Sequence, residues 1–298
     1  MMKYTQEENG YDPGSIKSTR ETIQSQICSS LAGAGNLQSL QWARGKSFSW
    51  DELTCYMATK KGHLDVLKYA RGQKCPWDSM VCAVAAGSGH LNVLRWLREN
   101  GCPWDKVTCL KAAGSGRLDV LKWAHENGCH WDKHACAVAA WKGDFAVLKW
   151  LHENGCPWDE ETCSGAAGQG HFDIVKWAHE KGCPWNEETC AMAAWHGYLD
   201  IIQWARSRGC PWDHMTFENA QVGGHQEVLE WCRANGCPDQ PDSESASDSS
   251  SESSSDTDSD IDSDTDSDLD SEAESDIDSD ADSDLESEAE SDGDNETE

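Results

Sequence analysis

The sequence predicts an all-α protein, an α-solenoid of stacked helix–turn–helix repeats followed by a disordered acidic tail. Three observations predict this fold class. Tryptophan recurs every 27 residues without an insertion or deletion, cysteine recurs at the same interval, and half of the acidic residues gather at one end of the chain. A fixed period of roughly 20–50 residues is typical of repeat proteins whose units bury their apolar faces by stacking on one another.

Four positions define the repeating unit. One holds Trp50, Trp77, Trp104, Trp131, Trp158, Trp185 and Trp212, and a second holds Trp42, Tyr69, Trp96, Trp123, Trp150, Trp177, Trp204 and Trp231. Two further positions begin at Cys28 and Cys75 and hold all the cysteines except Cys232. We therefore expect an N-terminal disordered or capping segment over 1–22 and a repeat array over 23–238. The array has a degenerate first unit at 23–49 and units beginning at residues 50, 77, 104, 131, 158, 185 and 212. Cysteines that mark repeat positions are expected to be reduced.

Each unit is expected to form two short helices. In the unit that begins at Trp104, Asp105 is a good N-cap for a first helix, which ends near Gly114. The segment 118–124 carries apolar residues on one broad face of a second helix, and Asn127-Gly128 ends that helix. One such pair cannot enclose a core, so stacking must bury both aromatic ladders.

Short segments of the array resemble ankyrin repeats. The stretches 62–67, 89–94 and 170–175 are similar to the second-helix signature of that family, and 108–113 is similar to the start of its first helix, with Cys109 where the family usually has proline. The stretch 153–159 resembles the family's Gly-Ala-Asp-Val-Asn segment. The resemblance extends over residues 23–238 and implies a protein-binding module. Ankyrin units are about 33 residues long, and the residues missing here fall where the family has its β-hairpin finger, so we expect a short or absent finger.

The sequence lacks the usual motifs of catalytic and cofactor sites. The segment 45–47 imitates the end of a phosphate-binding loop but lacks the required upstream glycine, and His-Glu pairs such as His125-Glu126 lack a second histidine one helical turn later. The densest group of potential metal ligands is Cys129, His130, His134 and Cys136, in which both cysteines hold repeat positions and no Cys-x-x-Cys clamp is present. We expect no catalytic, cofactor or metal site, and hence no enzyme.

Candidate partner-binding residues are those that depart from the repeat. Most units end the first helix with glycine, but two units have Trp141-Lys142 and Trp195-His196, the two tryptophans outside the ladders. If exposed, they would anchor a partner on the concave side of an ankyrin-like stack; alternatively, each ring packs over a small glycine of a neighbouring unit. Further candidates begin the first helices of four units: Lys106, Lys133, Glu160 and Glu187.

A basic stripe is expected along the second helices. Its residues are Lys68, Arg95, Lys122, Lys149 and Lys176, and a second series three residues later is Arg71, Arg98, His125, His152, His179, Arg206 and Arg233. Because residues three apart share a helix face, both series are expected on one outward face. The alternative is an ordinary solvated face that nearby acids such as Asp119 and Glu126 neutralise.

Charge divides the chain into two parts. Residues 1–238 hold all 24 basic residues and 27 of the 54 acids, for a net charge of −3, whereas residues 239–298 hold the other 27 acids and no lysine or arginine. Such a tail cannot bury enough apolar surface to fold. Its serines recur every four residues beside acids, which suits acid-directed kinases; the candidate sites are Ser259, Ser263, Ser267, Ser271, Ser275, Ser279, Ser283 and Ser287. We expect residues 256–292 to dock transiently on the basic stripe.

These features favour a non-enzymatic scaffold or adaptor that binds another protein through the solenoid surface. The alternative is an acidic-tail binder of basic proteins such as histones, with the array as a targeting module. The weakly acidic array is not expected to bind nucleic acid directly. No apolar run is long enough for a membrane helix, and the N-terminus lacks the apolar core of a secretory signal. We expect a cytoplasmic protein, with the nucleus as a second possible compartment, and a monomer.

Overall fold

The computed structural model describes residues 13–240, with side chains from residue 20 onward. Within this range the chain forms sixteen α-helices and no strand, which confirms the all-α fold class for this part. The helices are α1 (Pro13–Gly33), α2 (Leu37–Gly45), α3 (Glu52–Lys60), α4 (Leu64–Gly72), α5 (Ser79–Gly87), α6 (Leu91–Glu99), α7 (Lys106–Gly114), α8 (Leu118–Glu126), α9 (Lys133–Lys142), α10 (Phe145–Glu153), α11 (Glu160–Gly168), α12 (Phe172–Glu180), α13 (Glu187–Trp195), α14 (Leu199–Ser207), α15 (His214–Val222) and α16 (Gln226–Ala234). Residues 1–12 and the acidic segment from residue 241 on, with all eight candidate phosphorylation sites, lie outside the described residues.

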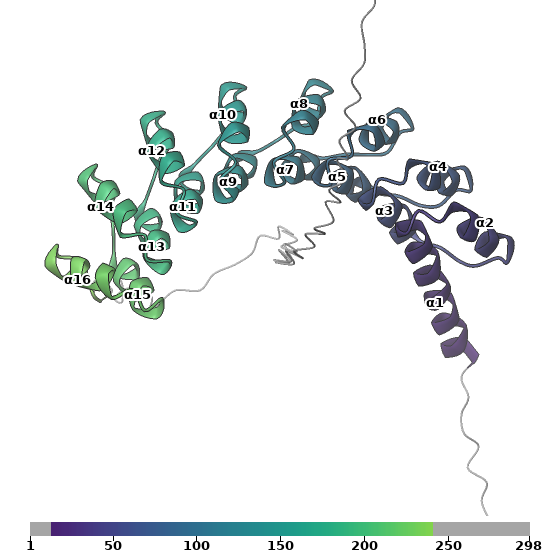
Figure 1. The fold of residues 1–298 in the computed structure, drawn as a ribbon, viewed down its shortest axis with the longest axis horizontal. Coiled ribbons are helices and arrows are strands. Elements are labelled where there is room, and N and C mark those ends of the chain that lie inside the picture. Colours follow the sequence, from purple (N-terminus) through teal and green to yellow (C-terminus); the bar gives the residue numbers. More distant parts are fainter. Residues whose placement is uncertain (1–12, 241–298) are drawn as a thin grey trace, which may run out of the picture. The chain divides into compact units, whose positions relative to one another are not determined.

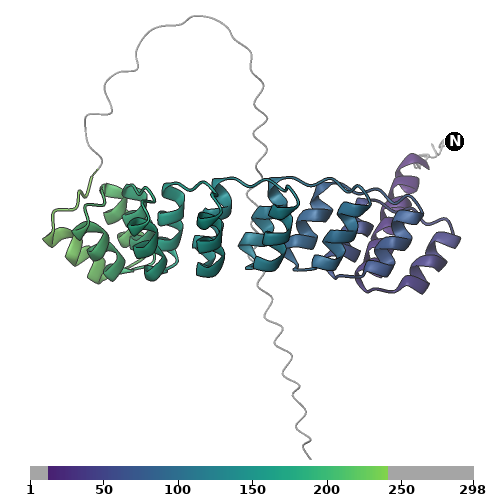
Figure 2. The same ribbon diagram turned by 90° about the horizontal axis from the view of Figure 1, so that it is seen from above.

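The helices form two rows. Each odd-numbered helix packs on the odd-numbered helices of the neighbouring units and on the second helix of its own unit, as α11 does with α9, α13 and α12. The odd-numbered helices lie along the inner side of the curved array, and the even-numbered helices lie along its outer side (Figure 1). Seen from above, the helices lie across the array with their connecting turns along its two edges (Figure 2). We call the odd-numbered helices the inner row and the even-numbered helices the outer row.

The first helix differs from its expected form. It begins at Pro13, whereas the array was expected to begin at residue 23. Proline is tolerated in the first turn of a helix because its missing N–H would have no intrahelical partner there. Neither glycine nor proline occurs between Gly14 and Gly33. The helix therefore continues without interruption from Pro13 through the expected start of the array at residue 23.

Capping interactions repeat from unit to unit. The aspartates at positions 78, 105, 132, 159 and 213 each accept a hydrogen bond from the backbone N–H two residues later, which confirms the N-cap that the sequence predicts. At the end of α6, the Asn100 side chain donates to the Trp96 carbonyl at 2.8 Å, and Gly101 follows with a φ of 78°. The next helix begins at Lys106. No strand forms in this connection, as the shortened unit predicts.

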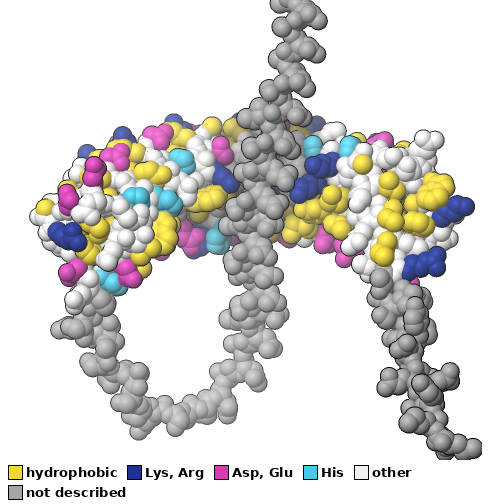
Figure 3. Space-filling view, turned by 60° about the horizontal axis from the view of Figure 1, so that its bottom comes forward, with side chains coloured by type: hydrophobic (Ala, Val, Ile, Leu, Met, Phe, Trp, Pro, Cys, Tyr) yellow, Lys and Arg dark blue, Asp and Glu magenta, His cyan; other side chains and the backbone are white. Residues whose placement is uncertain are grey.

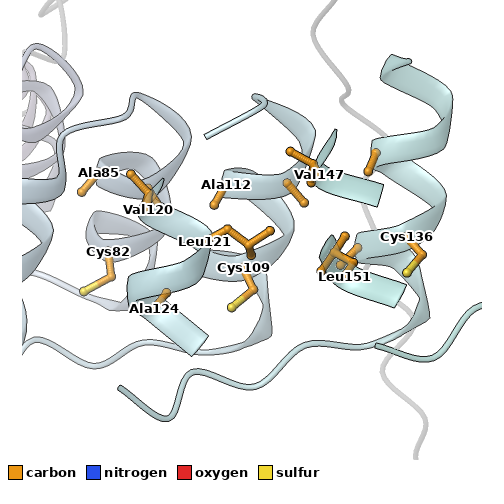
Figure 4. Close-up of a cluster of buried hydrophobic side chains, with 14 of the residues drawn as sticks. Cys82, Ala85, Cys109, Ala112, Val120, Leu121, Ala124, Cys136, Val147 and Leu151 are labelled. Atoms are coloured by element: carbon orange, nitrogen blue, oxygen red, sulfur yellow. The ribbon is translucent and has the colours of Figure 1, made fainter. Parts of the chain in front are cut away.

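The core is built from small side chains. Cys109 and Ala112 of α7 meet Val120, Leu121 and Ala124 of α8, and all five are fully buried (Figure 4). Most ladder tryptophans are only partly buried against this core and pair edge to face, as Trp77 and Trp96 do with ring centroids 6.0 Å apart, and Trp42 is 59% exposed. Burial of the two aromatic ladders is therefore less complete than the sequence predicts.

Candidate partner-binding surface

Trp141 and Trp195 lie at the ends of two inner-row helices, α9 and α13. Their side chains are 38% and 45% exposed. A Cβ added to Gly165 of the next unit would lie 3.5 Å from the Trp141 Cβ, so the base of that side chain, but not its ring, lies beside a glycine. Both side chains are thus partly open to solvent at the ends of their helices.

Histidines of the following unit hold the backbone at both tryptophans. The His171 Nε2 lies 3.2 Å from the Trp141 carbonyl oxygen, and the His225 Nε2 lies 2.9 Å from the Trp195 carbonyl oxygen. The last carbonyls of a helix have no intrahelical partner, so a donor from the next unit satisfies them and fixes the helix end. His63 and His90 make the same contact with Gly33 and Lys60.

Sequence reasoning missed these histidines. Successive units hold His63, His90, Arg117, Asp144, His171, Tyr198 and His225 at this repeat position. Histidine follows a tryptophan by 30 residues in two units, but it also follows Gly33 and Lys60 by 30 residues, so its presence does not single out the tryptophans. In the structure, His171 and His225 contact the helix ends that carry the two candidate anchors.

Charged neighbours differ between the two tryptophans. The Lys142 Nζ lies 4.5 Å from the centroid of the Trp141 ring, a cation–π arrangement. His196, which follows Trp195, lies with its ring centroid 6.1 Å from that of Tyr198. Both Lys142 and His196 are exposed, as expected for residues that would contact a partner.

Two of the candidate lysines join neighbouring units. The Lys106 Nζ lies 3.0 Å from Asp132, and the Lys133 Nζ lies 2.6 Å from Asp159 and 3.2 Å from Glu161. Hydrogen bonds that Lys133 donates to the Asp159 and Glu161 carboxylates raise the pKa of this lysine above its usual value. Burial opposes ionisation of Asp132, but hydrogen bonds from Lys106 and His134 lower the pKa of this carboxyl overall. These lysines are thus already paired, whereas Glu160 and Glu187 are exposed.

The predicted basic stripe lies on the outer row. Lys68, Arg95, Lys122 and Lys149 are exposed, and Lys176 is half-buried. The Nζ atoms of Lys149 and Lys176 lie 3.7 and 4.2 Å from the ring centroids of Phe145 and Phe172. None of the five stripe residues forms an ion pair within residues 20–240.

The second basic series has a different role. Arg98 stacks over Trp104 with 4.0 Å between guanidinium carbon and ring centroid, and also donates to the Cys102 carbonyl. His125 stacks on Trp131 with ring centroids 3.6 Å apart. Arg71, His152, His179 and Arg206 stack on the turn tryptophans of their next units in the same way. This corrects the expectation that both series share one outward face, because a side chain that bends toward the turn tryptophan no longer extends the stripe.

Several cysteine thiols form hydrogen bonds with the backbone of the turns between units. The thiols of Cys102, Cys129 and Cys183 donate to the carbonyls of the N-cap residues 24 positions earlier, at 3.3–3.4 Å. A hydrogen bond with Cys163, together with burial, raises the pKa of the Cys183 thiol. Among the described residues, no group of three or more His, Cys, Asp or Glu side chains is placed to hold a metal ion. His134, a member of the candidate cluster, lies 3.1 Å from Asp132 instead.

Comparisons with known proteins found similarity among solved structures. No protein-family model matches the chain, and no curated protein matches it. Among solved structures, the human ASB11 ankyrin repeat domain is similar to this chain, with 19% sequence identity and a TM-score of 0.44, over 53% of this chain and 84% of that domain. In the described part, no helix is both long and apolar enough to span a bilayer. The described residues form an α-solenoid of stacked helix pairs, as the sequence predicts.

Proposed function

We propose that the chain is a non-enzymatic protein-interaction module, a scaffold or adaptor that binds a protein partner through its inner row. The observation that carries this proposal is the pair Trp141 and Trp195. Each is an exposed aromatic residue at the end of an inner-row helix, and each helix end is fixed by a histidine of the next unit. Preorganised tryptophans that keep one face free are typical hot spots of protein interfaces. We further propose that the protein acts as a monomer in the cytoplasm or nucleus and needs no cofactor.

Affinity capture with quantitative mass spectrometry tests this proposal. The full-length chain is compared with the double variant Trp141→Ala/Trp195→Ala, which should lose its specific partners. Trp42→Ala is the matched control, because Trp42 is 59% exposed but lies on α2 of the outer row. The proposal fails if the double variant retains the partners, or if Trp42→Ala loses the same ones.

A second candidate function places binding in the acidic segment. Residues 239–298 carry 27 acids and no lysine or arginine, which favours association with basic proteins such as histones through long-range attraction. Deleting residues 241–298 separates the two candidates. Loss of every partner on this deletion, with no effect of the tryptophan substitutions, would favour the acidic segment.

A further inference from the structure

The inner row changes the sign of its charge partway along the array. From α3 to α9 its helices carry five lysines and one glutamate, whereas from α11 to α15 they carry five glutamates and no lysine or arginine. The lysines are Lys60, Lys106, Lys111, Lys133 and Lys142, and the glutamates of the second part are Glu160, Glu161, Glu187, Glu188 and Glu218. The inner row is therefore basic from α3 to α9 and acidic from α11 to α15.

Part of this charge is used within the array. Lys106 and Lys133 form ion pairs with the next unit, and Glu161 is one of the acceptors. The other members are exposed and form no ion pair within residues 20–240: Lys60, Lys111 and Lys142 in the basic part, and Glu160, Glu187, Glu188 and Glu218 in the acidic part. Three unpaired lysines thus remain in the basic part, together with the exposed Glu52 of α3, and four unpaired glutamates remain in the acidic part.

The two exposed tryptophans stand on either side of the change in sign. Trp141 ends the last basic helix, and Trp195 ends the second acidic helix. The helix between them, α11, has Gly168 at the position that tryptophan holds in α9 and α13, and the Met192 side chain of α13 lies 3.2 Å from a Cβ added to that glycine. Packed helices lie about 8–10 Å apart, which places the two helix ends roughly 16–20 Å from one another. Figure 3 looks toward this side of the array and shows hydrophobic side chains among charged ones.

We propose that the inner row binds a bipolar partner segment: acidic at one end, basic at the other, with two bulky apolar side chains between them. The apolar side chains contact Trp141 and Trp195, the acidic end lies over α7 and α9, and the basic end lies over α13 and α15. The proposal rests on the proposed function and specifies the chemistry of its partner. Complementary charge of this kind fixes the direction of binding and rejects segments of one sign.

Charge also argues against the two occupants that this chain itself could supply. The segment 241–298 has no basic residue, so it would be attracted by the basic part of the row and repelled by the acidic part. A second copy in antiparallel orientation would match the charges, but two rows that each lie on the inner side of a curve can meet only near their ends (Figure 1). A bipolar segment of another protein complements the charge of both the basic and the acidic part of the inner row.

Designed peptides test the charge order directly. The probe is a fluorescent amphipathic helix of about 24 residues with a glutamate block, two leucines about 20 Å apart and a lysine block, since a helix rises about 1.5 Å per residue. The control peptide has the same composition with its charges interspersed. Fluorescence anisotropy with the full-length chain should show the bipolar peptide binding about tenfold more tightly at physiological salt, and raised salt should remove the difference.

Charge reversals on the protein sharpen the test. Lys111→Glu/Lys142→Glu and Glu187→Lys/Glu188→Lys should each weaken binding of the bipolar peptide. The variant that combines all four substitutions should bind the bipolar peptide again, but in the opposite direction along the array. A photo-crosslinker at the acidic end of the peptide reports this direction. The outer-row control Lys68→Glu/Lys122→Glu should leave binding unchanged.

Three results would overturn the inference: equal affinity for the two peptides, tighter binding of an all-acidic or all-basic peptide, or charge-dependent dimers of the wild-type chain in sedimentation. If cellular partners still depend on Trp141 and Trp195 in that case, the proposed function stands and only the bipolar partner fails.

Discussion

The contact between Gly143 and His171 predicts how strongly the next unit holds Trp141 in place. Gly143 has a φ of 77°, and a Cβ added there would lie 2.5 Å from Cε1 and 2.8 Å from Nε2 of His171. Gly143→Ala must therefore displace the imidazole and break its 3.2 Å hydrogen bond to the Trp141 carbonyl. The left-handed backbone costs a non-glycine residue about 1–2 kcal/mol, and loss of this solvent-exposed hydrogen bond adds about 0.5–1.5 kcal/mol. We expect a total destabilisation of about 1.5–3.5 kcal/mol.

Gly128 provides the matched control. Its φ is 83°, but nothing lies within 4 Å of an added Cβ, so Gly128→Ala should cost only the backbone part, about 1–2 kcal/mol. Urea unfolding followed by far-UV circular dichroism measures both, with midpoints and slopes compared because repeat arrays can unfold in stages. In a His171→Ala background the extra cost at Gly143 should disappear. Equal costs at the two glycines in the wild-type background would refute the contact.

The exposed tryptophans, the buried thiols and the acidic segment each yield a measurable expectation. Trp141→Ala or Trp195→Ala should weaken partner binding at least about tenfold with helicity intact; a loss of several kcal/mol in array stability would instead place that ring in the core. The buried cysteines should react with a thiol reagent only in denaturant, and a chelator should not change helicity; stoichiometric zinc in native mass spectrometry would contradict this. Hydrogen bonding to partner cysteines and burial raise the pKa of Cys156, Cys183 and Cys190. Stability should therefore be constant below the unfolded thiol pKa of about 8.5 and fall at higher pH, where the unfolded state loses these protons first; a flat profile into alkaline pH would contradict the burial argument. Residues 256–292 should dock on the basic stripe at low salt, more tightly when phosphorylated; small-angle scattering that shows equal extension at low and high salt, with and without phosphate, would rule this out.

The repeat period predicted nearly all of the helices because each unit carries its own landmarks. Asp105 marks the start of a first helix, Gly114 its end and Asn127-Gly128 the end of the second helix, and the structure has its boundaries at these residues or directly beside them. The start of α1 was not predicted, because residues 1–22 lie outside the 27-residue period, although Asp12 and Pro13 are residues that commonly begin a helix. Local sequence fixes a helix end where a cap or a glycine is present, and elsewhere the helix continues as far as its neighbours permit.

The candidate site was only half predictable for a physical reason. Trp141 and Trp195 are visible as departures from the repeat, so the sequence alone singles them out. His171 and His225 are not, because their partners lie 30 residues away in the preceding unit and the contact exists only once the units stack. Spacing likewise placed Arg98 on an outward face, but its long side chain bends back to the Trp104 ring, a choice that helical periodicity does not determine.

Repeated positions fix the packing of this array, and unrepeated positions determine the chemistry of its surface. The turn edge is built from the same contacts in nearly every unit: a cysteine thiol on an N-cap carbonyl, an arginine or histidine on a tryptophan, and aromatic rings paired edge to face. These contacts fix the position of each helix pair relative to the next, whatever the inner-row residues are. A change from glycine to tryptophan, or from lysine to glutamate, on the inner row therefore alters the chemistry of the surface without altering the spacing of the helices. Binding specificity in such an array depends on the order of its unrepeated residues, which here are lysines and then Trp141 from α3 to α9, followed by glutamates and Trp195 from α11 to α15.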